Sequence, residues 1–503
     1  MGKDQVGRRD HLNKDLGRRS GRGVAMVLSA QWTRFVIQIG STAILARILT
    51  PGDYGLVAMV LVVTALADRF KDLGLSMATI QRKDITDAQI NTLFWINTGV
   101  GFVLTLLLIG SAPLVAVFFK RPELAGITTA LASMFLIGGL GVQHQALLKR
   151  HMRYGWLASS EVAAMVVGMG TAVILALLGF GYWALVANYV GQALTRTSLA
   201  WIAIRWIPGP PRRGAGIRSL LAFGGNVSAF GLLNYLSRYM DNLLIGRSWG
   251  AADLGMYSKA YQMLLLPLQQ INGPLSSVAV PALSLLQDEP TRFRRYYLSA
   301  VSFIAFITAP LVALMAALSS DVINVFLGNQ WEPAAPIFRV LALVGALQGI
   351  SNTNGWLYIS MSNTGRMARW ALISRPIVVA SFFIGLPWGP LGVATAFAVS
   401  GYVLVWPSIY LATKETPVSP SDVLKAIWRP FAIAGVVYGL VSWTRPMFSS
   451  LGSLEGLLVG SLLGLLTFGA IALVWPAVRS EVRDHIAYGV SVLRGKGSGA
   501  PAA

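Results

Sequence analysis

Long apolar segments recur along the whole chain and are separated by short polar connections. A helix that crosses a bilayer needs about 20 predominantly apolar residues, and each of these segments is long enough to cross once. We therefore predict an all-α polytopic membrane protein with about fourteen transmembrane helices. The expected spans are 24–46, 54–79, 89–118, 123–147, 156–178, 182–204, 219–246, 252–283, 297–318, 335–359, 368–386, 390–412, 426–443 and 455–476.

The basic residues are distributed unevenly over the two sides of this arrangement. Of the 41 Lys and Arg residues, 28 fall in the connections on the side of the N-terminus, five in the opposite connections and eight within the expected helices. Because basic connections stay on the cytoplasmic side of a membrane, both termini are expected in the cytoplasm. The net charge of +20 is then explained as anchoring against anionic membrane lipids, and we expect no nucleic acid partner.

Composition excludes several kinds of chemistry. Only 12% of the 503 residues are charged and 54% are hydrophobic, whereas soluble domains carry about 25% charged residues. The absence of Cys excludes disulfides, thiolate catalysis and Cys-based metal centres. His144, His151 and His485 are isolated in the sequence. We therefore expect no catalytic residue, no metal and no cofactor.

The chain resembles itself at an offset of 200 residues. Each set of matching positions falls in the turn between the first two helices of a half and in the helix that follows. An even number of helices between the copies preserves their orientation, as in transporters built from two parallel lobes. We predict two pseudo-symmetric lobes around a central cavity. The matching pairs are Arg47 and Arg247, Asp53 and Asp253, Gly55 and Gly255, Leu66 and Leu266, Leu75 and Leu275, and Ser76 and Ser276.

The repeat divides the chain into six parts. A tail precedes the first lobe, a linker joins the lobes, and two additional helices and a second tail follow them. The expected parts are the N-terminal tail 1–23, the N-lobe 24–206, the linker 207–218, the C-lobe 219–413, the two additional helices 414–476 and the C-terminal tail 477–503.

A polar stripe marks the first helix of each lobe. Its residues are spaced by three or four positions and therefore share one helical face. The stripe either lines a water-filled cavity or hydrogen-bonds between helices. For the arginines we favour the cavity, because a cation within the membrane costs about 2.5–3.5 kcal/mol. The stripe consists of Gln31, Arg34, Gln38 and Ser41 in the first lobe, and of Gly231, Asn234, Arg238 and Asp241 in the second.

The expected helix over 252–283 contains Pro267, Pro274 and Pro281 at intervals of seven residues, with Gly273 beside the middle one. Each proline removes a backbone donor and can bend the helix. We predict a hinge at Gly273 and Pro274 that serves alternating access, and static curvature around a cavity is the alternative.

Three segments resemble a known family. The stretch Leu45-Ala-Arg-Ile-Leu-Thr-Pro-Gly-Asp-Tyr-Gly-Leu56 resembles the first outside turn of polysaccharide exporters in the multidrug/oligosaccharidyl-lipid/polysaccharide (MOP) superfamily. Gln81-Arg-Lys-Asp-Ile-Thr86 and Leu148-Lys-Arg-His-Met-Arg-Tyr154 are similar to cytoplasmic loops of its Wzx-type subfamily, which includes colanic acid and exopolysaccharide exporters. The resemblance implies a flippase in a bacterial inner membrane. It would move an undecaprenyl-diphosphate-linked oligosaccharide from the cytoplasmic to the periplasmic face by alternating access, for exopolysaccharide or lipopolysaccharide synthesis. Its expected partners are this substrate, membrane lipids, and a polysaccharide polymerase and co-polymerase.

Charges within the expected helices favour an anionic substrate. Eight cations face four acids, so the cavity should be positive and should attract an anion. We interpret Glu161 and Arg196 as a structural ion pair, since they lie at similar depth in neighbouring helices. The remaining acids are Asp68, Asp72 and Asp241, of which the first two neutralise part of the charge on Arg69 and Lys71.

We hypothesise that cations at staggered depths pass the diphosphate across the membrane, because an arginine offers a fork of donors to phosphate oxygens. Tyrosines beside them contact the sugars, or are ordinary interfacial aromatics. Asp241 is the candidate for coupling to H+ or Na+, and its pairing with Arg238 is the competing explanation. The candidate substrate-binding residues are Arg34, Gln38, Arg69, Lys71, Asn234, Tyr235, Arg238, Lys259 and Tyr261.

Two other classes of protein share some of these features. A cation-coupled drug or small-molecule exporter of the MATE type is expected to contain more acids than bases in its membrane helices, and this chain shows the reverse. A membrane-bound polysaccharide polymerase, ligase or glycosyltransferase needs catalytic groups on a substantial outside loop. The longest outside connection, 319–334, offers only Asp321 and Glu332.

The charge distribution generates a topology prediction. Reporters that work only in the periplasm or only in the cytoplasm, fused after Gly181, Asn329 and Ala503, should place the first two positions in the periplasm and Ala503 in the cytoplasm. Periplasmic activity of the fusion at Ala503 would contradict the fourteen-span topology.

Overall fold

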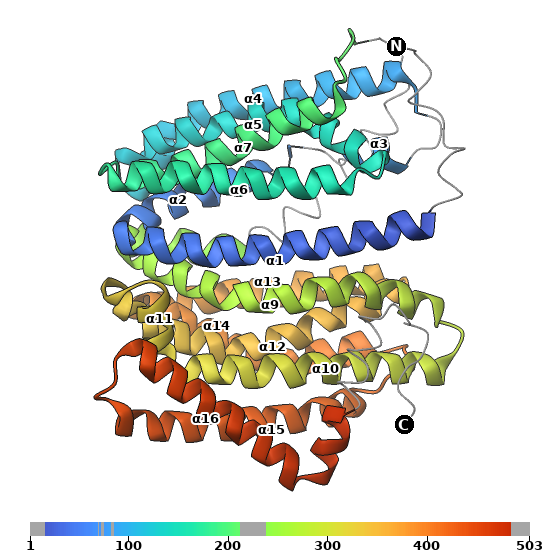
Figure 1. The fold of residues 1–503 in the computed structure, drawn as a ribbon, viewed down its shortest axis with the longest axis vertical. Helices are drawn as coiled ribbons and strands as arrows, with labels where there is room; N and C mark the ends of the chain where they lie inside the picture. The colour runs from blue at the N-terminus through green and yellow to red at the C-terminus, as the bar shows by residue number, and fades with distance from the viewer. Residues whose placement is uncertain (1–15, 69, 72–74, 82–84, 212–237, 484–503) are drawn as a thin grey trace. The chain divides into compact units, whose positions relative to one another are not determined.

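The structure is a computed structural model that describes residues 16–68, 70–71, 75–81, 85–211 and 238–483. Within these ranges every regular element is a helix (Figure 1). The chain forms two compact units, Met1–Gly255 and Met256–Ala503. The finer division into lobes, linker and tails stays a prediction.

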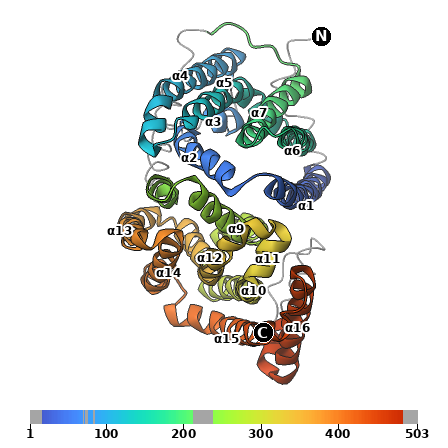
Figure 2. The ribbon, with the colours of Figure 1, turned by 90° about the vertical axis from the view of Figure 1, so that its left-hand side faces the viewer.

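The first unit is a bundle of long helices joined by short turns. Helices α4 and α5 pack against each other, α6 packs against α7, and α1 lies along α6 (Figure 2). A further helix covers 238–248, where the described part of the chain resumes. The named helices are α1 (Leu16–Ile48), α2 (Pro51–Asp68), α3 (Leu75–Gln81), α4 (Asp87–Phe119), α5 (Glu123–Arg150), α6 (Tyr154–Leu177) and α7 (Tyr182–Ile204).

The second unit is also built of helices, and α15 and α16 are its last two long helices. Helix α9 begins in the first unit and continues into the second. The elements are α9 (Ala251–Leu285), α10 (Pro290–Ala317), α11 (Ser319–Phe326), η1 (Asn329–Ala334), α12 (Ala335–Ser360), α13 (Thr364–Gly385), η2 (Leu386–Trp388), α14 (Gly389–Thr413), α15 (Pro420–Thr444), η3 (Arg445–Phe448) and α16 (Ser453–Val474).

The helices follow the hydrophobic pattern of the sequence. Each expected span overlaps a helix of the described chain, and nine described segments are both long and apolar enough to cross a membrane. The protein is therefore a multi-pass membrane protein. The number fourteen stays a prediction, because the span expected over 219–246 is described only from residue 238 onwards.

One expected span is wrong in extent. The segment 54–79 was expected to form a single helix, but α2 ends at Asp68 and a separate short helix, α3, begins at Leu75. Three charged residues and a glycine fall between these ends, in the sequence Arg69-Phe-Lys-Asp-Leu-Gly74. Charges are costly within an apolar span and glycine weakens a helix, so the helix ends where the charges begin.

Close backbone contact joins α4 to α5. A Cβ atom added at Gly139 would lie 2.7 Å from the carbonyl oxygen of Asn97, and one at Gly101 would collide with the carbonyl oxygen of Phe135. In a membrane, small residues allow helices to approach and gain dispersion energy that lipid does not provide. The two glycines therefore set the distance between α4 and α5.

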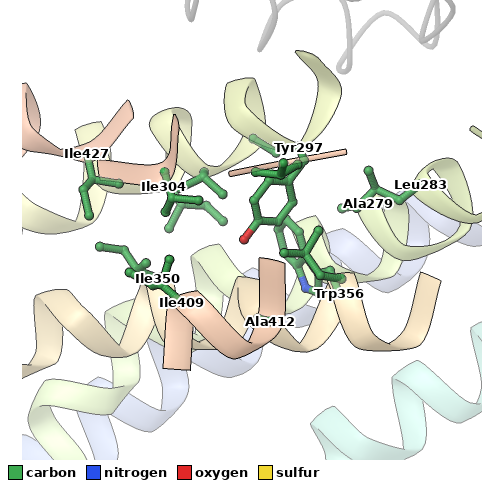
Figure 3. Close-up of a cluster of buried hydrophobic side chains, with 14 of the residues drawn as sticks. Ala279, Leu283, Tyr297, Ile304, Ile350, Trp356, Ile409, Ala412 and Ile427 are labelled. Carbon is green, nitrogen blue, oxygen red and sulfur yellow. The ribbon is translucent and has the colours of Figure 1, made fainter. Parts of the chain in front are cut away.

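The core of the second unit lies between α9, α10, α12, α14 and α15. Tyr297, Ile304 and Ile350 are each fully buried there, and Ile427 of α15 packs against the same cluster (Figure 3). Trp356 completes one side of it and donates from its indole nitrogen to Ser276 over 3.0 Å. This cluster anchors α15 to the rest of the unit.

Two arginine–carboxylate pairs hold the C-terminal helices in place at opposite ends. Arg294 of α10 donates to both carboxylate oxygens of Asp422 over 2.8 and 2.6 Å. Arg445 donates to both oxygens of Asp321 over 2.7 Å each. Such bidentate pairs fix orientation as well as distance, so α15 has a defined position along α10.

Helix α16 presents a row of small residues. Gly456, Gly460 and Gly464 are its buried residues. A Cβ at Gly460 would lie 2.6 Å from Leu318, and one at Gly464 would lie 2.8 Å from Leu314. The row is therefore a packing surface.

The two copies of the repeated turn meet within the first unit. A Cβ at Gly55 would collide with the carbonyl group of Ala251, and a Cβ at Gly255 would collide with the carbonyl oxygen of Pro51. The two contacts are reciprocal, because Gly255 is the equivalent of Gly55 and Ala251 is the equivalent of Pro51 at an offset of 200 residues. The two copies of the turn, which lie 200 residues apart in the sequence, therefore contact each other through equivalent positions.

The contact at Gly55 predicts a position-specific effect. Gly55→Ala should lower the thermal unfolding midpoint of the purified protein, because the added methyl group meets backbone that cannot rotate away; a cost of about 1–3 kcal/mol is typical of such overpacking. Gly52→Ala in the same turn is the matched control, since its Cβ would meet only the Thr50 hydroxyl, at 3.6 Å. Equal midpoints for the two variants would disprove the close approach.

Candidate functional site

An ion pair within the first unit involves the arginine of the first polar stripe. Arg34 of α1 donates to Glu161 of α6. The predicted pair of Glu161 with Arg196 is wrong, because the structure places Glu161 against Arg34 of the neighbouring helix α1. The side chains of Arg34 and Glu161 are 31% and 40% exposed, so both are open to a ligand or to water.

Arg196 extends this pair into a larger charged cluster. Its charge interacts with that of Arg34 and with that of Asp68 at the end of α2. The Nε atom of Arg196 is buried and has no hydrogen-bond partner within the described chain. The two guanidinium groups therefore lie within electrostatic range of each other, and Glu161 and Asp68 are the acids of this cluster.

Local packing explains why Arg196 faces α6. Asn188, Gln192 and Arg196 are spaced by four residues and share one face of α7. Gly168 of α6 lies against this face, because a Cβ there would be 2.5 Å from Gln192 and 2.7 Å from Asn188. The small residue lets α7 approach α6 closely, and this brings Arg196 to the level of Glu161.

Lys71 lies at the edge of the same cluster. Its ammonium group is 3.7 Å from the carboxylate of Asp68, and its side chain is 29% exposed. Its end also touches Gly138 of α5. This distance between Lys71 and Asp68 agrees with the prediction that Asp68 neutralises part of the charge on Lys71.

The polar stripe of α1 is partly exposed along its length. Gln31, Arg34, Gln38 and Ser41 are all intermediate in exposure, and the Ser41 hydroxyl donates to the backbone oxygen of Gln38 over 2.8 Å. On another face of the same helix, Val36 is 67% exposed. The assignment of Gln38 to the substrate stays a prediction.

Several candidates lie at or beyond the edge of the described residues. Arg69, Asn234 and Tyr235 are outside them, so their predicted roles stay predictions. Arg238 is the first described residue of the helix over 238–248 and is exposed. Asp241, three residues further on, is only 5% exposed, which makes it less accessible than Glu161.

Two candidates belong to the second unit. Lys259 of α9 is 8% exposed and donates to the side chain of Gln262 over 2.9 Å. The hydroxyl of Tyr261 accepts a hydrogen bond from Gln348 of α12 over 3.2 Å, and its ring packs edge-on against Phe397 of α14. Contacts of this kind also hold helices together, so substrate binding by Lys259 and Tyr261 stays a prediction.

Helix α9 passes through its three prolines without interruption. It runs from Ala251 to Leu285 with Pro267, Pro274 and Pro281 inside it. A Cβ at Gly273 would meet nothing within 4 Å, so this position is open. The hinge at Gly273 and Pro274 stays a prediction.

Two charged groups outside the membrane helices have shifted acidities. Hydrogen bonding to Arg366 lowers the pKa of Glu415, and burial lowers the pKa of His151. Both groups lie in connections between helices and belong to neither the Arg34 pair nor its neighbours. Among the described residues, no group of three His, Asp or Glu side chains is arranged to hold a metal ion.

The helical fold and the charged cluster define a multi-pass transporter-type membrane protein, and comparisons with known proteins place it more closely. The model of the polysaccharide biosynthesis protein family matches residues 44–336. The teichuronic acid biosynthesis protein TuaB of Bacillus subtilis (strain 168) is 30% identical over 435 residues, covering 84% of this chain and 89% of the relative. The chain therefore belongs to the polysaccharide biosynthesis protein family.

Two further comparisons agree with this assignment. The lipopolysaccharide biosynthesis protein WzxC of Escherichia coli (strain K12) is 26% identical over 424 residues, covering 81% of this chain and 85% of the relative. Among solved structures, the lipid II flippase MurJ in an inward closed conformation superimposes with a TM-score of 0.70 and 15% identity, covering 88% of this chain and 98% of that one. At this identity the likeness shows that the two chains share a fold.

The exposure of the α1 stripe generates a labelling prediction. Single cysteines at positions 34 and 38 of this Cys-free chain should react in membranes with a charged thiol reagent, because reagent carried by water reaches a polar stripe. A cysteine at position 36 is the matched control and should stay unlabelled, since lipid covers an exposed valine. Equal protection at all three positions would mean that the stripe faces no water.

Proposed function

We propose that this protein is a flippase that translocates an undecaprenyl-diphosphate-linked oligosaccharide repeat unit from the cytoplasmic to the periplasmic face of the inner membrane. The observation that carries the proposal is the pair of neighbouring guanidinium groups, Arg34 and Arg196, held inside a helical bundle with the fold of a lipid II flippase. A diphosphate is the part of such a substrate that crosses the apolar layer at greatest cost, and arginines offset that cost by charge-assisted hydrogen bonds.

In this proposal the charged cluster of the first unit receives the diphosphate. Arg34 offers its guanidinium fork from α1 and Arg196 adds a second cation from α7. Arg69 and Lys71 attract the headgroup on the cytoplasmic side, and Arg238 and Lys259 follow towards the periplasm. Gln38, Asn234, Tyr235 and Tyr261 contact the sugars.

Alternating access moves the substrate between the two faces. The hinge at Gly273 and Pro274 permits bending of α9 during this change. Asp241 is the proposed coupling site for H+ or Na+. Both termini lie in the cytoplasm, and a polymerase and co-polymerase receive the translocated unit.

The drug exporter of the MATE type is the closest alternative, because fold alone does not separate the two. The separation rests on charge. When the four residues at each end of a span are left out, the expected membrane helices carry eight cations and four acids. The cluster around Arg34 holds arginines at its centre. Such a site attracts anions and repels the organic cations that a drug exporter binds.

A membrane enzyme is disfavoured by the structure of the outside segment. The chain from 319 to 334 folds into α11 and η1, and both oxygens of Asp321 accept hydrogen bonds from Arg445. A buried, paired carboxylate has no freedom to act as an acid or base. The relatives also favour transport, because one of them is named a succinoglycan biosynthesis transport protein.

The proposal predicts a loss of export without loss of protein. Arg34→Ala, expressed in the host after deletion of its own gene, should reduce polymer export about 10- to 150-fold at equal membrane abundance, which corresponds to losing a charged hydrogen bond of about 1.5–3 kcal/mol. Arg34→Lys should recover only part of the export, since an ammonium group cannot form the bidentate contact.

Arg47→Ala is the control for this measurement, because Arg47 is exposed at the end of the same helix. Export per molecule should be normal in this variant. The lipid-linked repeat unit should accumulate on the cytoplasmic leaflet only in the Arg34 variants. Normal export by Arg34→Ala would remove Arg34 from the substrate path.

A further inference from the structure

The Arg34 guanidinium group is already occupied by the carboxylate of Glu161. In the proposed function Arg34 binds a diphosphate, yet in this structure its guanidinium group already binds a carboxylate. A carboxylate and a phosphate are both acceptors for the same fork of donors. They also repel each other, so the two anions compete for Arg34.

Glu161 differs from Asp68 and Asp241 because it is both exposed and in direct contact with Arg34. Its side chain is 40% exposed and contacts Arg34 directly. Asp68 contacts Lys71 and interacts with Arg196. Asp241 is 5% exposed, and its carboxylate accepts from the backbone of Asn242 over 2.7 Å. Glu161 is thus the acid that an incoming anion meets at Arg34.

Neighbouring charges make the site more attractive once Glu161 has moved. Arg196 lies near Arg34, and the two positive charges destabilise each other. Glu161 offsets this repulsion while the site is empty. An anion that replaces Glu161 must offset this repulsion equally well. A diphosphate carries enough charge to offset both guanidinium groups, whereas a smaller anion of lower charge does not.

We propose that Glu161 is a resident counter-ion that the diphosphate displaces from Arg34, and that this competition makes the site specific for diphosphates over monophosphates. The inference rests on the proposed function and adds a specificity-determining residue to it. In the empty protein Glu161 keeps Arg34 neutralised. Glu161 then helps to release the diphosphate by returning to Arg34 and replacing it there.

The proposal makes Glu161→Gln a gain-of-binding variant. Binding of inorganic pyrophosphate and of inorganic phosphate to the purified protein is measured by calorimetry at constant pH and ionic strength. Glu161→Gln should bind pyrophosphate about tenfold more tightly, a factor equivalent to about 1.4 kcal/mol. Its affinity for phosphate should rise more than its affinity for pyrophosphate, so that the preference for pyrophosphate shrinks.

Glu123→Gln is the matched control, since it removes the same charge from an exposed position in the first turn of α5. Its affinities should equal those of the wild type. Glu161→Asp keeps the charge but shortens the side chain, and should bind pyrophosphate more tightly than the wild type without reaching the Gln variant. This second variant carries the test if Glu161→Gln does not fold.

The outcomes separate the counter-ion from the transport function. Pyrophosphate binding that requires Arg34 but is unchanged or weaker in folded Glu161→Gln and Glu161→Asp overturns the counter-ion and leaves the proposed function standing. An equal rise in affinity in Glu123→Gln also overturns it, because the effect would then be one of net charge. If Arg34→Ala leaves pyrophosphate binding unchanged, or no variant binds pyrophosphate, diphosphate recognition at Arg34 fails and the counter-ion proposal fails with it.

Discussion

A guanidinium group inside a membrane protein must be neutralised or hydrated, and this constraint organises the first unit. Arg34 meets it through Glu161, and Arg196 lies within range of both Arg34 and Asp68. Because these residues come from α1, α2, α6 and α7, the cluster ties together helices far apart in sequence. The second unit uses charge differently, since its bidentate pairs at Asp422 and Asp321 lie at helix ends and serve to position α15.

Much of the fold could be predicted from the sequence, because apolar segments of membrane length leave the backbone little choice but helix. Spans such as 123–147 and 156–178 correspond closely to α5 and α6. The break between α2 and α3 was missed because the window average across 54–79 stays apolar. The charged run beginning at Asp68 was the signal that could have revealed it.

The candidate site was harder to predict. Periodicity placed Arg34 and Glu161 on particular helices, and sequence adjacency favoured Arg196 as the partner of Glu161, since the two lie on consecutive helices. The actual partner comes from α1, which lies along α6 although more than a hundred residues separate them. Sequence spacing carries no information about which non-consecutive helices touch, and this is why the pairing required the structure.

The two copies of the turn contact each other reciprocally, Gly55 with Ala251 and Gly255 with Pro51. Such a contact has the form of an isologous interface, in which one surface patch binds a second copy of itself. A chain of half the length, carrying one copy of this turn, would need no second surface to form a dimer through it. In this chain Gly55 and Gly255 allow the two copies of the patch to meet within one polypeptide. A bulky residue at either glycine would therefore disturb the contact between the copies.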